Sequence, residues 1–146
     1  MKPSIVAILG LLTPILFNPD IKAANPDHIQ QLLSTRECQG CDLSGANLTA
    51  AHLIGADLRD ANLKGANLTE ANLEGADLTG TNLEGANLTS SMLTNATLNS
   101  SILDNVNLTK AIIYDADVSG ASMMALIIDG AEIFYTGISV GGESPE

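Results

Sequence analysis

The feature that most constrains the fold of this chain is a period of five residues. Leucine, or another large apolar residue, stands at every fifth position from Leu43 to Ile138. A small residue, most often alanine, stands two positions before most of these centres. A period of five is neither the 3.6 residues of a helix nor the 2 residues of a flat strand. The pattern therefore restricts the fold class strongly, although it says far less about function.

Each unit of the pattern reads small, polar, centre, polar, turn, and twenty units run over residues 41–140. The small and centre positions both point inward, because two steps along an extended chain return to the same side. Glycine is frequent at the fifth position, as at Gly45 and Gly55, where it permits a sharp bend. No proline lies between Pro26 and Pro145, which suits an unbroken backbone ladder.

A second period of twenty residues lies over the first. The string GANLT occurs at 45–49, 65–69 and 85–89, and it returns as NVNLT at 105–109. Four units therefore make one turn, and the twenty units predict about five coils with a length of roughly 24 Å. The polar columns that result, such as the Asn and Thr of each GANLT, can exchange side-chain hydrogen bonds along the stack, and they are expected to stabilise the coil.

The repeat, seen as AHLIG, ADLRD, ANLKG, ANLTE, ANLEG and ADLTG, resembles that of the pentapeptide-repeat family and covers 100 of the 146 residues. The resemblance implies an all-β fold, a right-handed quadrilateral parallel β-helix. A leader, a short helix and a Cys-x-x-Cys before the first coil resemble secreted pentapeptide-repeat proteins of cyanobacteria. The match loosens after Leu88, where outward positions become apolar.

The N-terminus has the composition of a signal peptide over residues 1–24. Lys2 precedes an apolar run of 13 residues, Ile5 to Phe17, which is too short to span a membrane. Ala23 and Ala24 are small residues suited to cleavage. The protein is then exported to the periplasm, the thylakoid lumen or the exterior, and it has no membrane segment after cleavage. The alternative is a buried N-terminal strand or helix.

Residues 25–40 predict a capping helix and a linker, and residues 141–146 a flexible tail. Asn25 is suited to cap the helix, and Pro26 to open it. Ile29, Leu32 and Leu33 are spaced to lie on one face, so the helix can cover one end of the coils.

Cys38 and Cys41 have the spacing of a redox motif. The pair is either a thiol–disulfide centre or a small disulfide that fastens the helix to the first coil. The second interpretation is favoured, because Cys41 occupies an inward position and no thioredoxin-like strand–helix unit surrounds it.

The formal net charge is -11. Removal of the leader leaves 4 basic and 16 acidic residues, a charge of -12. Such a chain repels phosphate, so direct nucleic-acid binding is not expected. The column of Asp57, Asp77 and Asp117 is predicted to be solvated acidic surface rather than a Ca²⁺ site. The pattern indicates no catalytic residues, metal site or cofactor, and no enzyme activity.

The aromatic residues after the leader are Tyr114, Phe134 and Tyr135, and all three fall at outward positions of one face in the last two coils. Met92 and Ile112 share that face. Outward apolar residues that gather on one face suggest a contact, here with an unknown protein partner or with a second copy in a homodimer. The alternative is an irregular last turn that folds these side chains over the open end.

The sequence thus favours an exported, non-catalytic structural or protein-interaction module. A DNA-mimicking inhibitor or protector of a topoisomerase such as gyrase is the first alternative, because the resemblance includes acidic family members with that role. A thiol–disulfide redox protein acting through Cys38 and Cys41 is the second alternative.

Overall fold

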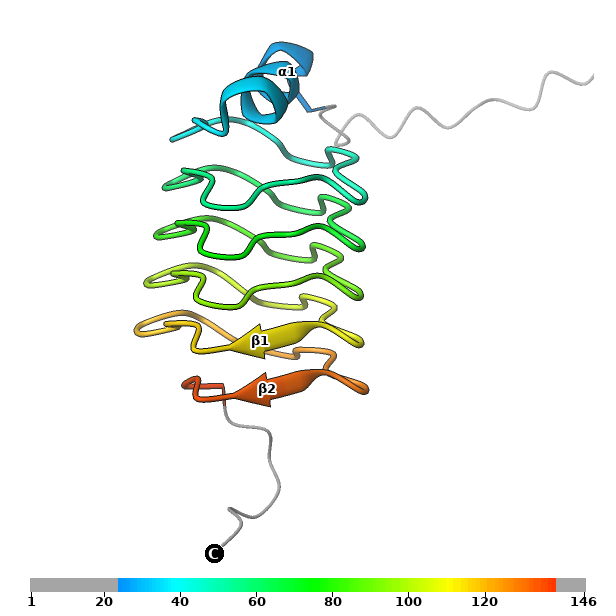
Figure 1. Ribbon diagram of the computed structural model, residues 1–146, viewed down its shortest axis with the longest axis vertical. Coiled ribbons are helices and arrows are strands. Elements are labelled where there is room, and N and C mark those ends of the chain that lie inside the picture. The colour runs from blue at the N-terminus through cyan, green and yellow to red at the C-terminus, as the bar shows by residue number, and fades with distance from the viewer. Residues whose placement is uncertain (1–23, 139–146) are drawn as a thin grey trace, which may run out of the picture.

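The structure, a computed structural model, describes residues 24–138, so the predicted tail at 141–146 and nearly all of the predicted signal peptide lie outside the described residues. Three elements follow in order: helix α1 (Pro26–Thr35), strand β1 (Ile112–Tyr114) and strand β2 (Glu132–Phe134). Helix α1 lies across one end of a stack of flat coils, and β2 lies in the last coil at the other end (Figure 1).

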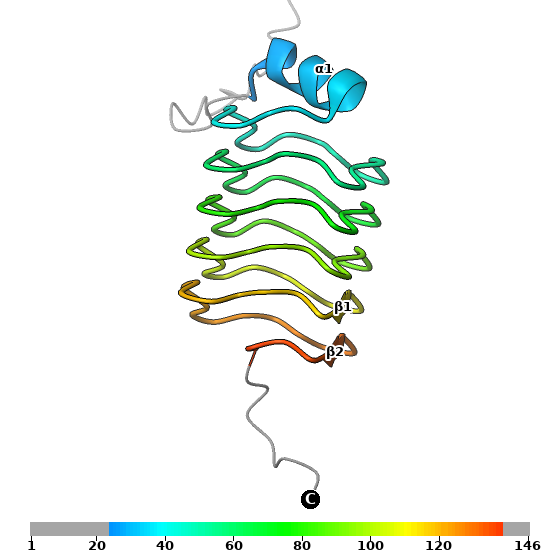
Figure 2. The same ribbon diagram turned by 60° about the vertical axis from the view of Figure 1, so that its left-hand side comes forward.

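The coils pair with one another in a register of twenty residues. Parallel bridges join residues twenty apart, from Glu37 with Asp57 to Asn107 with Ile127. Strands β1 and β2 continue the same register, with Ile112 opposite Glu132. Figure 2 shows from a second side that the coils lie directly above one another. The twenty-residue period of the sequence is therefore the pairing register of the structure.

The corners between the short extended segments share one backbone conformation. Every fifth position from 40 to 135 has a positive φ, at nine glycines and at eleven other residues with φ between 52° and 59°. A hydrogen bond closes most of these corners, as from the Ala46 N–H to the Leu43 carbonyl at 3.0 Å. This is the pattern of a turn that requires a positive φ at its third residue. The bend predicted for glycine is thus also made by other residues.

The core is a column of stacked leucines flanked by small residues. The centres from Leu43 to Leu108 are all buried, with 4% or less of each side chain exposed. Each such burial contributes roughly 1.5–3 kcal/mol before entropy is counted. Thr81, buried at a small position, satisfies its hydroxyl by donating to the Leu58 carbonyl at 2.7 Å. Ser91 and Ser101, also buried at small positions, donate to the carbonyls of Leu88 and Leu98, so each buried hydroxyl in this core has a carbonyl partner.

Helix α1 is built as its sequence predicts, except for one residue of its apolar face. The Asn25 side chain accepts a hydrogen bond from the Asp27 N–H, and the helix ends at Arg36, whose φ is 61°. Leu32 is fully buried and Ile29 packs against the core, but Leu33 is 55% exposed. The prediction for Leu33 is wrong because successive helical residues lie about 100° apart, so a helix resting on one coil edge buries only a narrow stripe.

Candidate functional site

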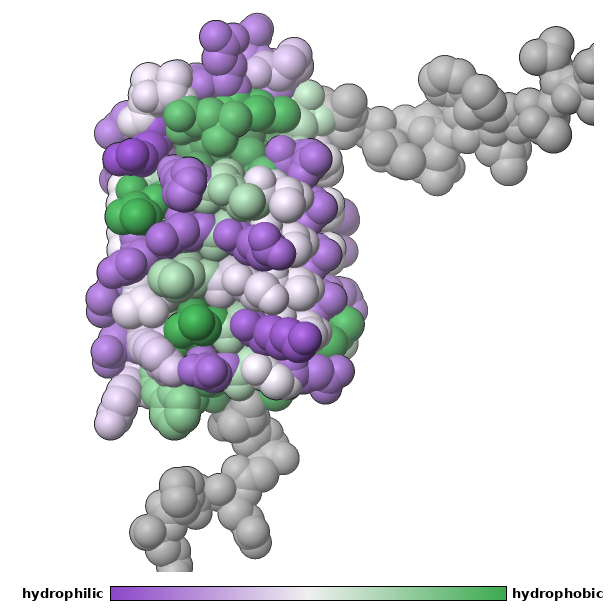
Figure 3. Space-filling model, turned by 45° about the vertical axis from the view of Figure 1, so that its right-hand side comes forward, coloured by the Kyte–Doolittle hydropathy of each residue, from purple (hydrophilic) through white to green (hydrophobic). Residues whose placement is uncertain are grey.

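The structure brings the five predicted surface residues together on one face of the last coils. We call this set the aromatic surface: Met92, Ile112, Tyr114, Phe134 and Tyr135. Met92 pairs with Ile112 through a parallel bridge, and Tyr114 lies opposite Phe134 in the strand register. The Tyr114 and Phe134 rings contact each other, with centroids 5.3 Å apart and planes tilted by 52°. In Figure 3 the largest apolar area lies near the end of the molecule that carries α1, and the apolar side chains further down are separated by polar ones.

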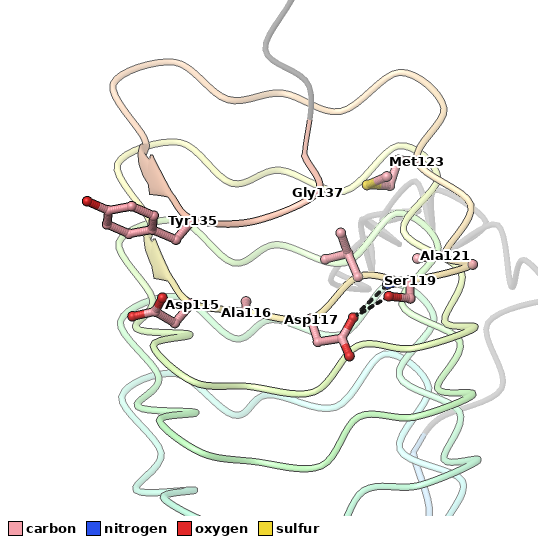
Figure 4. A pocket seen from close by; sticks show the side chains of 10 residues that line it. Asp115, Ala116, Asp117, Ser119, Ala121, Met123, Tyr135 and Gly137 are labelled. Carbon is pink, nitrogen blue, oxygen red and sulfur yellow. Dashed lines mark hydrogen bonds between the residues drawn. The ribbon is translucent and has the colours of Figure 1, made fainter.

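The aromatic surface is open to solvent rather than folded into the core. Tyr135 is 87% exposed, Phe134 55% and Met92 37%, whereas Ile112 and Tyr114 are half-buried. In Figure 4 the Tyr135 ring points away from the coil. The alternative prediction, in which these side chains fold over the open end, is therefore wrong for Phe134 and Tyr135.

A hydrogen bond between the two strands holds Tyr114 in place. Its hydroxyl donates to the Oε2 atom of Glu132, which stands on β2. This hydrogen bond, with a smaller contribution from burial, raises the pKa of the Tyr114 phenol above its usual value. The phenol therefore stays protonated at physiological pH, and its ring is fixed against Phe134.

Two hollows flank Tyr135. One, of about 270 Å³, is lined by Tyr114, Asp115, Phe134 and Tyr135. The other, of about 550 Å³, lies between Tyr135 and the segment 115–121 (Figure 4). Within it the Asp117 carboxylate accepts from the Ser119 hydroxyl at 2.6 Å and from its N–H at 3.0 Å. The Ser119 hydroxyl bond lowers the pKa of Asp117, so this carboxylate is ionised.

Cys38 and Cys41 form a disulfide in the structure, with their Sγ atoms 2.04 Å apart. Cys38 is fully buried and Cys41 is 4% exposed. The pair lies between the end of α1 and the first coil, and the Cys38 N–H donates to the Asp57 carbonyl at 2.8 Å. A redox centre must be reached by its substrate, so this burial fits a fastener better than a reactive thiol.

An arginine pairs with the first aspartate of the column. Arg59 donates to both carboxylate oxygens of Asp57, at 2.8 and 2.6 Å, and its Nε lies 3.9 Å from Asp77. The hydrogen bond from Arg59 lowers the pKa of Asp57 below its usual value. Among residues 24–138, no three His, Cys, Asp or Glu side chains gather in a way that would hold a metal ion.

In the described coils, the Asn and Thr columns hydrogen-bond within each repeat. The Asn47 Oδ1 atom accepts from the Thr49 hydroxyl at 2.7 Å and from the Thr49 N–H at 3.2 Å. Asn67 and Asn87 make the same bonds to the threonine two residues on. The Asn-x-Thr spacing is the sequence signal of this turn. It predicts the hydrogen-bond partner of the Asn side chain better than the stacking of Asn residues twenty apart does.

Within the described part of the chain, no helix has both the length and the apolar character that crossing a membrane requires. Helix α1, with 10 residues, is its one helix.

The fold and the periodic core define a pentapeptide-repeat solenoid. The family model Pentapeptide repeats matches residues 41–80, 66–105 and 93–123 with 8 copies, and the chain belongs to this family. No curated protein sequence matches the chain.

A solved structure supports the fold, and others are similar in sequence. A pentapeptide repeat protein from the cyanobacterium Nostoc is 29% identical, with a TM-score of 0.59, over 73% of this chain and 96% of that protein. A pentapeptide repeat protein from the thylakoid lumen of Arabidopsis thaliana is also 29% identical, with a TM-score of 0.43. That match covers 69% of this chain and 64% of the Arabidopsis protein. The fold is thus the right-handed β-helix of the family.

A more distant likeness is to QnrB1, a plasmid-mediated fluoroquinolone resistance protein. It is 16% identical, with a TM-score of 0.32, over 68% of this chain and 62% of QnrB1. At these values the likeness carries no argument about function.

Proposed function

We propose that this chain is an exported, non-catalytic pentapeptide-repeat protein that binds a protein partner through the aromatic surface. The observation that carries the proposal is the gathering of exposed apolar and aromatic side chains on one face of the last coils. Exposed clusters of this kind are typical of interaction sites, and aromatic residues dominate the binding energy of many interfaces. The rest of the rod, about five coils capped by α1, is the scaffold.

The outward polar residues support a non-catalytic role. The Asn and Asp side chains accept hydrogen bonds from neighbours two residues away, as Asn47 does from Thr49 and Asp77 from Thr79. Asp57 is engaged by Arg59. Such groups stabilise the corners of the backbone. They are not arranged as a nucleophile beside a general base, which covalent catalysis requires.

Two features support export. The composition of residues 1–24 is that of a signal peptide, and the buried Cys38–Cys41 disulfide suits an oxidising compartment. The periplasm and the thylakoid lumen are the compartments we propose. Fractionation and N-terminal sequencing of the mature protein test this, and an intact N-terminus in the cytosol would disprove it.

The partner proposal is tested by capture with purified protein. The test variant carries Tyr114→Ser, Phe134→Ser and Tyr135→Ser, and the matched control carries Ile54→Ser, which removes a 47% exposed apolar residue near the other end. We expect wild type and the control to retain the same partner, and the triple variant to lose it. Retention by the triple variant at wild-type levels would refute the role of the aromatic surface.

Neither alternative has a specific observation in its favour. The DNA-mimic interpretation has only the net charge of -11. The redox interpretation is disfavoured because Cys38 and Cys41 are both buried. Insulin reduction by the purified chain, abolished by Cys38→Ser, would revive the redox alternative.

A further inference from the structure

The free edge of β2 has backbone groups that the described residues leave unpaired. In the earlier coils, three backbone groups of each face make hydrogen bonds to the following coil. The Cys41 carbonyl accepts from the Asn62 N–H, the Leu43 N–H donates to the Asn62 carbonyl, and the Gly45 N–H donates to the Lys64 carbonyl.

On β2 the corresponding groups are the Ala131 carbonyl and the N–H groups of Ile133 and Tyr135. Among residues 24–138 none of these three has a backbone partner. An unpaired strand edge of this kind is a template for an added strand.

The side chains of β2 are also left partly uncovered. Ile113, the inward residue of β1, is 1% exposed, whereas Ile133 directly beyond it is only half-buried. Phe134 is 55% exposed beside the hollow of about 270 Å³. An added strand would bury apolar surface on both its inward and its outward sides.

The strand register fixes which residue of an added strand would stand over each residue of β2. Ile112 stands over Glu132 and Tyr114 over Phe134, so a further strand in the same register continues both columns. The residue of the added strand that pairs with Glu132 should be basic, because opposite charges in adjacent strands attract and like charges repel. The residue beyond Ile133 is best apolar, and the one beyond Phe134 aromatic.

We propose that the edge of β2 binds an extended segment of a partner protein with the pattern basic–apolar–aromatic. The basic residue donates its N–H to the Ala131 carbonyl and accepts from the Ile133 N–H. The carbonyl of the aromatic residue accepts from the Tyr135 N–H. This inference rests on the proposed function and specifies how the partner is held.

Charge argues against a second copy of this chain as the occupant. Asp115, Asp129 and Glu132 are all exposed around this end, and the chain carries a net charge of -11. Joining two such ends would bring like charges together, whereas a basic segment would neutralise them.

The test uses end-blocked synthetic peptides and the isotopically labelled full chain. The probe is Gly-Lys-Ile-Phe-Gly, and its counterparts carry Glu in place of Lys or an N-methyl group on the Lys amide. We expect the Lys peptide to bind roughly fivefold more tightly than the Glu peptide and to shift the amide signals of Ile133 and Tyr135. The N-methyl peptide is expected to lose binding, because it cannot donate to Ala131.

Glu132→Gln should remove most of the preference for Lys, whereas the matched control Glu74→Gln, on the same face near the other end, should keep it. Equal binding of the Lys and Glu peptides, or shifts confined to the first coils, would overturn the proposal. Self-association that protects the Ile133 and Tyr135 amides would also overturn it, by making a second copy the occupant. If capture still depends on the aromatic surface while the peptides fail, this inference fails and the proposed function stands.

Discussion

The corner residues illustrate how much one backbone position can tolerate. Tyr135, Lys110 and Asp60 all adopt φ values near 55° that glycine accommodates more easily. A left-handed conformation costs a residue with a Cβ roughly 1–2 kcal/mol. The corners persist without glycine because backbone hydrogen bonds to the adjacent coil hold the chain in place beside them.

Gly55→Ala should lower the free energy of unfolding by about 1 kcal/mol. Its φ is 64°, and an added Cβ would meet no atom within 4 Å, so the loss measures backbone strain alone. Urea denaturation checks this. The reciprocal control Ala50→Gly, at a corner with φ 55°, should not destabilise the protein. An equal loss in both variants would show that strain is not the cause.

At this scale the sequence predicted which side chains are buried but not how the polar ones bond. Leu73 and Ala71 are buried as the five-residue period requires. By its position in the repeat, Asn47 could bond along its column or to Thr49, and the structure has the bond to Thr49. A period identifies the direction of a side chain, whereas its hydrogen-bond partner depends on local geometry.

Helix α1 is an element whose stability depends on its attachments. Its 10 residues are too few for a stable isolated helix. It is fastened by the buried Leu32, by the Cys38–Cys41 disulfide, and by His28, whose Nδ1 accepts from the Asp42 N–H at 2.9 Å. The sequence predicted the helix and its cap from Asn25, but exposure of Leu33 depends on how the helix rests on the first coil.

The double variant Cys38→Ser, Cys41→Ser should lose about 2 kcal/mol of stability, because its short loop is no longer closed in the unfolded chain. Hydrogen exchange should accelerate in α1 and the first coil and remain slow at central amides such as that of Leu73. The wild-type protein under reducing conditions should behave alike. Uniform acceleration through every coil would contradict a local fastening role.

The molecule as a whole carries ionised carboxylates with lowered pKa values in several coils. Hydrogen bonds lower the pKa of Asp57 through Arg59, of Asp104 through Ser122, and of Asp117 through Ser119. A carboxylate with a lowered folded pKa stabilises the fold fully above its unfolded pKa, near 3.9. That stabilisation is lost as the pH falls through the lower folded value.

The free energy of unfolding should therefore fall steeply as the pH drops below about 4. Urea denaturation at a series of pH values between 6 and 2 measures it. Combining Asp57→Asn with Asp104→Asn should flatten the dependence, whereas the exposed Glu70→Gln serves as the matched control. A wild-type stability that does not change over this range would contradict the assignment.

The stacking register has a consequence for how chains of this kind can change length. Because residues pair twenty apart, excision of one whole coil, such as residues 66–85, would leave every remaining side chain in its own column. Loss of five residues would keep the leucines inside but rotate everything downstream onto the adjoining face, and loss of one residue would turn them out. Five residues are thus the repeat that keeps the core intact. Twenty residues are the length that can be removed or inserted while every outward side chain stays in its own column.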